Sequence, residues 1–283
     1  MVENRPFFTF LSHFIVLVGV LIVFFPVWMT FVASTHDQAT MLRAPVPLLP
    51  GTHLIENYRT VLLEGYGQRF GSNPMLHTLI NSMIMALGVA IGKIAISIIA
   101  AFAIVYFRFP ARMFFFWAIF VTLMLPVEIR IVPTYGVVAS LGMLDSYAGL
   151  IIPVIASATA TFLFRQFFLS VPDELAEAAR VDGASPMRFF WDILLPMSRT
   201  SIAALFVIQF IYGWNQYLWP LLITTKESYY TMVMTVSRQA NVVDSVPSWN
   251  LLMAMAMLAM LPPVLVVVFM QRLFVRGLVE TEK

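Results

Sequence analysis

Four polar residues interrupt apolar stretches of this chain and are the first candidates for chemistry. Glu128 and Arg130 lie near the end of one stretch, and Asn215 and Gln216 lie within another. Polar groups are costly in an apolar segment, so such residues often line a pathway for a polar solute. Anchoring at a membrane interface is the alternative for Glu128 and Arg130, as it is for the aromatic residues around Asn215.

The chain offers no set of residues typical of an enzyme. It has no cysteine, and its four histidines lie at no metal-ligand spacing from a carboxylate, so no metal site is predicted. Residues 88–94 resemble a phosphate-binding loop only loosely, because the glycines are one residue too close and neither Ser nor Thr follows Lys93. Gly88 and Gly92 fit better as a small-residue packing face. We therefore expect a non-catalytic chain without a cofactor of its own.

The composition indicates an integral membrane protein. Hydrophobic residues make up 60% of the 283 residues and charged residues 11%, which is too little polar surface for a soluble domain. A helix needs about 20 mostly apolar residues to cross a bilayer, and backbone groups in lipid must bond within the segment. We expect one all-α transmembrane domain over residues 1–283, with six spanning helices near residues 11–33, 76–107, 113–132, 147–169, 201–222 and 251–274.

The basic residues predict how these helices are oriented. With the N-terminus inside, ten of the 17 Lys and Arg residues fall on the inner side, six fall outside, and Lys93 lies within a span. The short loop that holds Arg108 and Arg112 carries most weight, because the positive-inside rule applies best to short loops. We expect both termini in the cytoplasm. Lys93 would then extend towards the inner surface or pair with a carboxylate of a neighbouring subunit.

A polar insert at residues 170–200 separates the fourth and fifth predicted spans. Asp173 opens its first helix and Gly183 ends it with a left-handed cap, while Ser185 and Pro186 begin a second helix that Pro196 limits. One face of the first helix is predicted to hold Leu175, Ala178, Ala179 and Asp182. The apolar stripe of the second is predicted to be Met187, Phe190, Trp191 and Leu194. The pattern alone fits either an amphipathic helix on the bilayer surface or a docking element.

The insert resembles the EAA loop of permease subunits in bacterial ATP-driven importers. The matching residues are Glu177, Ala178, Ala179, Gly183, Ile193, Leu194, Leu195 and Pro196. Residues 101–110, 144–150 and 214–221 are similar to the carbohydrate-importer branch, which contains the smaller permease of the maltose importer. Permeases of sn-glycerol-3-phosphate importers are also similar over residues 3–6, 123–130, 156–168 and 274–279. The likeness covers nearly the whole chain and is weaker over residues 66–74 and 226–246.

This resemblance implies a type I ABC importer permease fold in the bacterial inner membrane. It implies three kinds of partner: a second permease, two copies of a subunit that binds ATP and Mg, and a periplasmic or lipid-anchored binding protein. The insert would couple ATP hydrolysis to transport through Glu177, Ala178, Ala179, Asp182, Gly183 and Pro196. The mechanism would be alternating access.

The resemblance also implies the solute, sn-glycerol-3-phosphate or its diesters. Arg130 would attract the phosphate with Glu128 holding it in place, and Asn215 and Gln216 would offer neutral hydrogen bonds deeper in the pathway. A neutral sugar is the alternative solute. A stand-alone secondary transporter is the alternative function, but the sequence shows neither the inverted repeats nor the broken helices typical of that class. No residues in the sequence support a membrane-embedded enzyme or binding to a nucleic acid.

Overall fold

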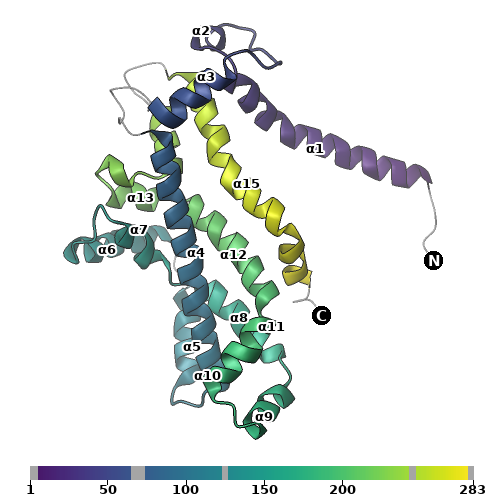
Figure 1. Ribbon diagram of the computed structural model, residues 1–283, viewed down its shortest axis with the longest axis vertical. Helices are drawn as coiled ribbons and strands as arrows, with labels where there is room; N and C mark the ends of the chain where they lie inside the picture. The colour runs from purple at the N-terminus through teal and green to yellow at the C-terminus, as the bar shows by residue number, and fades with distance from the viewer. Residues whose placement is uncertain (1–5, 65–73, 123–126, 242–246, 280–283) are drawn as a thin grey trace. The chain divides into compact units, whose positions relative to one another are not determined.

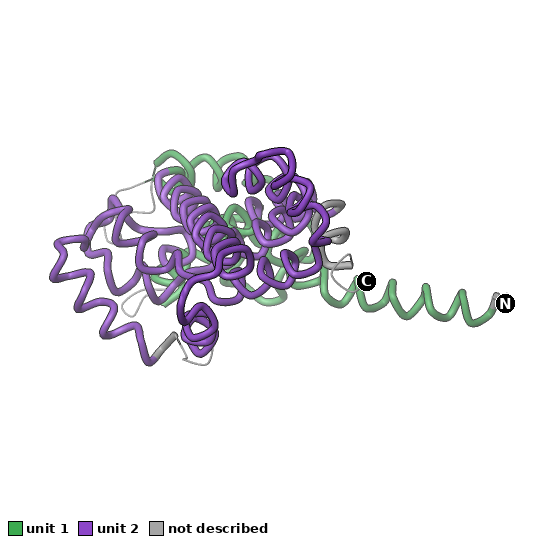
Figure 2. Tube along the Cα trace, turned by 90° about the horizontal axis from the view of Figure 1, so that it is seen from below, with its two compact units in different colours: residues 1–76, 236–260 green, residues 77–235, 261–283 purple. Residues whose placement is uncertain are grey.

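The computed structural model describes residues 6–64, 74–122, 127–241 and 247–279, without the side chains of residue 6, residues 127–128 and residues 272–279. Helices and loops account for all of this part of the chain (Figure 1). The chain divides into two compact units, residues 1–76 with 236–260 and residues 77–235 with 261–283 (Figure 2). The predicted side-chain role of Glu128 lies outside what is described.

The first unit is organised around one buried amide. It contains α1 (Pro6–Ser34), α2 (Gln38–Met41), α3 (Leu54–Arg59) with a π-helical turn at Thr60–Glu64, and the first part of α15 (Trp249–Val279). Asn57 Nδ2 donates hydrogen bonds to the carbonyl oxygens of Ser34 and His36, both at 2.8 Å. Asn250 Nδ2 donates to Asn57 Oδ1 at 3.1 Å. Asn57 therefore ties the end of α1 to α3 and to the start of α15.

The second unit is built along α4 (Met75–Tyr106), which continues into it from the first unit. The elements that follow are α5 (Arg112–Val121), α6 (Val127–Ser140), α7 (Tyr147–Ile151) with the 3-10 turn η3 (Ile152–Val154), α8 (Ala158–Ser170), α9 (Asp173–Val181), α10 (Pro186–Phe189), the π-helical turn η4 (Phe190–Leu194), α11 (Leu195–Met197), α12 (Arg199–Trp214), α13 (Leu218–Ile223), η5 (Glu227–Tyr229) and α14 (Met232–Ala240), whose end belongs to the first unit.

Length and composition single out three helices that could cross a membrane: α1, α4 and α15. Two further candidates are bent pairs, residues 147–154 with 158–170 at 49° and residues 186–197 with 199–214 at 71°, and α5 is a shorter apolar helix. The expectation of no broken helices is therefore wrong. In the first pair Pro153 lacks a backbone donor, and Ser157 caps a new helix by accepting from Ala160 N at 3.3 Å. The six-span count and the single-domain assignment stay predictions.

Small residues allow α4 to pack closely on its neighbours, as predicted for Gly88 and Gly92. A Cβ atom at Gly88 would lie 2.6 Å from Ile151 Cδ1, and one at Gly92 would lie 2.6 Å from Ile155 Cγ2. On another side of α4, a Cβ at Gly213 of α12 would lie 2.9 Å from Ala86 Cα. These contacts place α7, η3 and α12 directly against α4 (Figure 1).

Asp145 holds together the loops before α7 and after α13. Its Oδ1 accepts from the backbone N–H groups of Thr225 (2.6 Å) and Lys226 (2.8 Å), and its Oδ2 accepts from Thr225 Oγ1 at 2.7 Å. Desolvation raises the pKa of Asp145, but the hydrogen bonds to Lys226 and Thr225 and the Lys226 charge outweigh it, so the pKa lies below its ordinary value. The carboxylate therefore stabilises this loop pair at neutral pH.

We expect Asp145→Asn to speed hydrogen exchange at the Thr225 and Lys226 amides severalfold at pH 7. Asparagine tolerates the left-handed φ of 50° at this position, so the change tests the charge rather than the backbone. A carboxyl with a lowered pKa contributes above its unfolded pKa, about 3.9, and loses that contribution as the pH falls through the folded value. The difference between variant and wild type should therefore shrink as the pH falls below about 3.9 and vanish at the acid limit where the folded carboxyl is protonated, after correction for intrinsic exchange rates. A difference that persists there would contradict the role of the charge.

Candidate functional site

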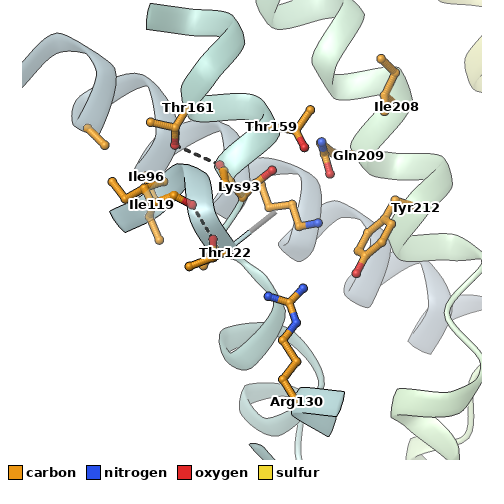
Figure 3. Close-up of a pocket in the computed structure, with 14 residues that line it drawn as sticks. Lys93, Ile96, Ile119, Thr122, Arg130, Thr159, Thr161, Ile208, Gln209 and Tyr212 are labelled. Carbon is orange, nitrogen blue, oxygen red and sulfur yellow. Dashed lines mark hydrogen bonds between the residues drawn. The ribbon is translucent and has the colours of Figure 1, made fainter. Parts of the chain in front are cut away.

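A cavity of about 640 Å³ lies within the second unit, between α4, α5, α6, α8 and α12. It is partly open, and its volume falls in the range of about 300–1,000 Å³ that is usual for small-molecule sites. Figure 3 shows the side chains that surround it. The lining residues are Lys93, Ile96, Ala100, Ile119, Thr122, Arg130, Ala156, Ser157, Ala158, Thr159, Thr161, Ile208, Gln209 and Tyr212.

Lys93 is the most deeply placed charge in this cavity. It lies near the middle of α4, about 27 Å from the first residue of the helix and about 20 Å from the last at 1.5 Å per residue. Only 6% of the residue is exposed. Its Nζ lies 3.5 Å from the centroid of the Tyr212 ring, which places the ammonium over the aromatic face. The long helix thus carries a cation into the interior of the unit.

Arg130 brings a second cation to the same space from α6. Figure 3 shows its guanidinium and the Lys93 ammonium pointing into the cavity, with the Gln209 amide close to Lys93. No residue among the described lining is acidic. The cavity therefore joins two cations that are distant in the sequence and gives them, within the described residues, no carboxylate partner.

Two threonine hydroxyls of the cavity wall are engaged with the backbone. Thr161 Oγ1 donates to the Ser157 carbonyl at 2.9 Å, and Thr122 Oγ1 donates to the Ile119 carbonyl at 2.6 Å. A hydroxyl has one hydrogen to donate, so these two threonines face the cavity as acceptors. The groups left to donate include the two cations, the Gln209 amide and the hydroxyls of Thr159 and Tyr212, a donor-rich lining that favours an acceptor-rich, anionic ligand.

Two of the predicted pathway residues lie elsewhere. Asn215 is exposed at the C-terminal end of α12, and Gln216 Nε2 donates to the Tyr212 carbonyl at 3.2 Å. Neither lines the cavity. The polar residues of α12 that do line it are Gln209 and Tyr212, which lie one to two turns earlier. Gln209 interrupts an apolar stretch, so the signal that singled out Asn215 and Gln216 could have found it, whereas nothing local marks Tyr212.

Asn81 and Ser82, near the start of α4, serve the structure of an adjacent loop. Asn81 is fully buried and its Nδ2 donates to the carbonyl oxygens of Ser228 (2.9 Å) and Tyr230 (3.0 Å). Tyr147 Oη donates to Asn81 Oδ1 at 2.6 Å. Ser82 Oγ accepts from Met232 N at 2.7 Å. Both side chains therefore hold the chain between α13 and α14 against α4.

The polar insert folds as its capping residues predict. Gly183 has a φ of 72°, and the Gly183 and Ala184 amides bond back to the carbonyls of Arg180 (3.0 Å) and Ala179 (2.8 Å), which is a Schellman cap on α9. Ser185 Oγ accepts from Arg188 N at 3.3 Å, with Pro186 at the first helical position. At the other end of α9, Pro172 is the residue that precedes the first helical residue, Asp173.

The faces of the insert differ from the prediction in part. Ala179 is buried with Phe189, Phe190 and Leu194 in one cluster, whereas Ala178 is exposed. Of the predicted apolar stripe, Phe190 and Leu194 are buried, whereas Met187 and Trp191 are 52% and 58% exposed. The π-helical turn at Phe190–Leu194, just before Pro196, shifts the helical register and turns adjacent Phe189 and Phe190 inward.

Aromatic contacts fix this insert to the membrane helices of its own chain. The Phe190 ring lies 4.9 Å from the Phe102 ring, and the Phe189 ring lies 5.3 Å from the Tyr106 ring, both on α4. The apolar face is therefore covered by protein, so it is not available to a bilayer surface. The exposed face, which we term the outer face of the insert, comprises Glu177, Ala178, Val181, Asp182, Met187 and Trp191.

Comparison with known proteins agrees with these features. The family described as "Binding-protein-dependent transport system inner membrane component" matches residues 93–280. The sn-glycerol-3-phosphate transport system permease proteins UgpE of Brucella melitensis biotype 1 and Escherichia coli O157:H7 are 56% and 55% identical to this chain, with all of each protein covered.

A solved structure shows the same fold. It is the crystal structure of a bacterial ABC transporter involved in the import of the acidic polysaccharide alginate, with a TM-score of 0.81, 20% identity, and 96% of this chain and 98% of that chain covered. The family match and the full-length relatives, both transport-system components, identify the chain as a non-catalytic, multi-pass membrane subunit of a transport system. The chain belongs to the family of binding-protein-dependent transport system inner membrane components.

Proposed function

We propose that this chain is a translocating permease subunit of an ABC importer for sn-glycerol-3-phosphate. The observation that carries the proposal is 56% identity, over all 283 residues, to a permease named for that transport system. A cavity with two cations and no described acid gives independent support, because a phosphate monoester carries between one and two negative charges at neutral pH. Glycerophosphodiesters, which carry one negative charge, fit the same chemistry.

Membership of the family means that the chain works together with other subunits of a transport system. The proposed set is a second permease, two copies of an ATP-binding subunit that holds ATP and Mg, and a periplasmic or lipid-anchored binding protein. The outer face of the insert would dock on the ATP-binding subunit. This docking is supported by the exposure of Val181 (87%) and Trp191, because the opposite face of the insert is packed against α4. Closure of the ATP-binding pair would then drive alternating access.

The orientation in the bacterial inner membrane is part of the proposal. Both termini would lie in the cytoplasm, together with the insert and with the loop between α4 and α5. Arg108 and Arg112 in that short loop support this orientation. The loops held together by Asp145 would then face outward, towards the binding protein.

The test is uptake of labelled sn-glycerol-3-phosphate into proteoliposomes that contain this chain, its second permease, the ATP-binding subunit and the binding protein. We expect ATP-dependent uptake that disappears when this chain is left out, with labelled maltose as the control solute. Maltose uptake without glycerol-3-phosphate uptake would contradict the assigned solute and show that a neutral sugar is transported instead. Uptake that requires neither ATP nor the ATP-binding subunit would favour a stand-alone transporter and contradict the proposal.

A further inference from the structure

We infer that Lys93 and Arg130 form a binding site for the phosphate group of the transported solute, within the cavity of about 640 Å³. This inference rests on the proposed function, since it assigns the anionic part of that solute to two residues of this chain. It differs from the sequence-based hypothesis, in which Arg130 acts near one mouth of the pathway and Lys93 takes no part.

The first step of the argument concerns the charge on Lys93. Removing an ammonium group from water costs several kcal/mol, whereas a cation over an aromatic ring recovers about 0.5–2 kcal/mol. Tyr212 supplies such a ring at 3.5 Å, and the residue is 6% exposed. The described neighbours therefore compensate the charge only in part. An anion that enters the cavity would supply the remainder.

The second step concerns the donors that surround this anion. A phosphate group accepts hydrogen bonds through three oxygens, so it favours a site with several donors. Lys93, Arg130 and the amide of Gln209 point into the same space in Figure 3. Arginine can bind two oxygens at once, and lysine acts as a compact charge. The hydroxyl hydrogens of Thr122 and Thr161 are already bonded to the backbone, so the donors that select the ligand are the cations, the amide and the remaining hydroxyls of the wall.

The third step concerns release. A transported solute has to leave its site, so the binding must be limited in strength. Arg130 is exposed at the cavity, and exposed charge pairs are worth at most about 1 kcal/mol. Most of the binding energy would then come from buried Lys93, while Arg130 guides the anion in. The glycerol part would meet the apolar and threonine-lined wall formed by α8.

The chain contains no cysteine, which allows a charge-rescue experiment at position 93. In the reconstituted four-component system, Lys93→Cys should lower glycerol-3-phosphate uptake about tenfold, the loss expected for one hydrogen bond to a charged group. Treatment with aminoethyl methanethiosulfonate restores an ammonium group and should recover uptake. The methyl analogue adds no charge and should not. Wild-type complex treated in the same way corrects for cysteines in the partner chains, and Lys226→Cys is the matched control on an exposed lysine.

A protection measurement separates ligand binding from a structural ion pair. Glycerol-3-phosphate should slow the modification of the Lys93→Cys thiol, while uncharged glycerol should not. If Lys93 instead pairs with a carboxylate of the second permease, the substitution will weaken co-purification of the two permeases and the solute will give no protection, which would overturn the inference. If Lys93→Cys fails to assemble for any reason, Arg130→Gln at its exposed position should still raise the KM for uptake.

The outcomes also separate this inference from the proposed function. Wild-type complex that imports maltose and no glycerol-3-phosphate rejects the proposed function, whatever the variants do. Wild-type complex that imports glycerol-3-phosphate, together with unchanged uptake by both Lys93→Cys and Arg130→Gln, rejects the phosphate site alone. Recovery by the methyl reagent equal to that by the aminoethyl reagent also rejects it, because the charge would then be irrelevant.

Discussion

Glu177→Lys is expected to reduce ATP-driven uptake more than tenfold while the membrane helices stay folded. Glu177 is exposed on the outer face of the insert, so the change removes no buried contact within the chain. Loss of one partner in a charge pair at an interface typically costs about 2–5 kcal/mol, and reversal adds repulsion. The measurement is ATPase activity stimulated by the loaded binding protein, together with uptake, in the reconstituted complex.

Gly183→Arg provides a second change at the same surface. A non-glycine residue at a φ of 72° costs about 1–2 kcal/mol, which a folded helix pair tolerates. A Cβ at this glycine meets no atom within 4 Å, so the new side chain would project outward and block a docked partner. Glu56→Lys, an exposed charge reversal on α3, is the matched control and should leave coupling intact. If both insert variants import the solute at the wild-type rate, the insert has no role in coupling.

Asn81→Leu is expected to destabilise the complex by about 2–4 kcal/mol, because three hydrogen-bonding groups would lose their partner in a buried place. Leucine has the same number and branching of side-chain heavy atoms as asparagine but can neither donate nor accept hydrogen bonds, and its two methyl groups are bulkier than the amide, so lost hydrogen bonds and tighter packing both contribute to the expected effect. The residues that would lose their partner are Tyr147, Ser228 and Tyr230. Thermal unfolding of the purified complex measures the effect, and faster proteolysis after Lys226 would localise it.

Tyr147→Phe is the control for this prediction. It removes one of the three hydrogen bonds and should cost about 1 kcal/mol, clearly less than Asn81→Leu. Should Asn81→Leu unfold like the wild type but import poorly, Asn81 would belong to the solute pathway and its structural role would be minor. Polarity within an apolar segment would then have been the better guide.

Local rules explain which features of the insert could be predicted. The cap at Gly183 and the helix start at Ser185–Pro186 depend on neighbouring residues, and both are confirmed. Which side chains of the second helix are buried depends on register over several turns. The π-helical turn before Pro196 changes that register, so Phe189 is buried and Trp191 is exposed. A periodicity of 3.6 residues does not anticipate such a turn.

The cavity depends on tertiary packing and could be predicted only in part. Arg130 was identified by its charge, and the small-residue face at Gly88 and Gly92 by its spacing. Nothing local indicates that Lys93 and Arg130 face one space, because α5 and the segment after it separate them in the chain. Nor does the sequence show that α12 ends at Trp214, which removes Asn215 and Gln216 from the cavity wall and leaves Gln209 and Tyr212 on it.

If α12 tilts as a rigid helix during transport, the close contact between Gly213 and Ala86 would act as a pivot near one end of it. From Gly213 the arm to Ser198, where the insert joins at a bend of 71°, is about 22 Å long at 1.5 Å per residue. The arm to Gln209 is about 6 Å, so a shift at the insert is reduced nearly fourfold at the cavity. A displacement of about 4 Å at Ser198 would move the Gln209 amide by about 1 Å, roughly the difference between a hydrogen bond and none. In such a tilt, a large movement of the insert would become a small adjustment of the Gln209 amide beside Lys93.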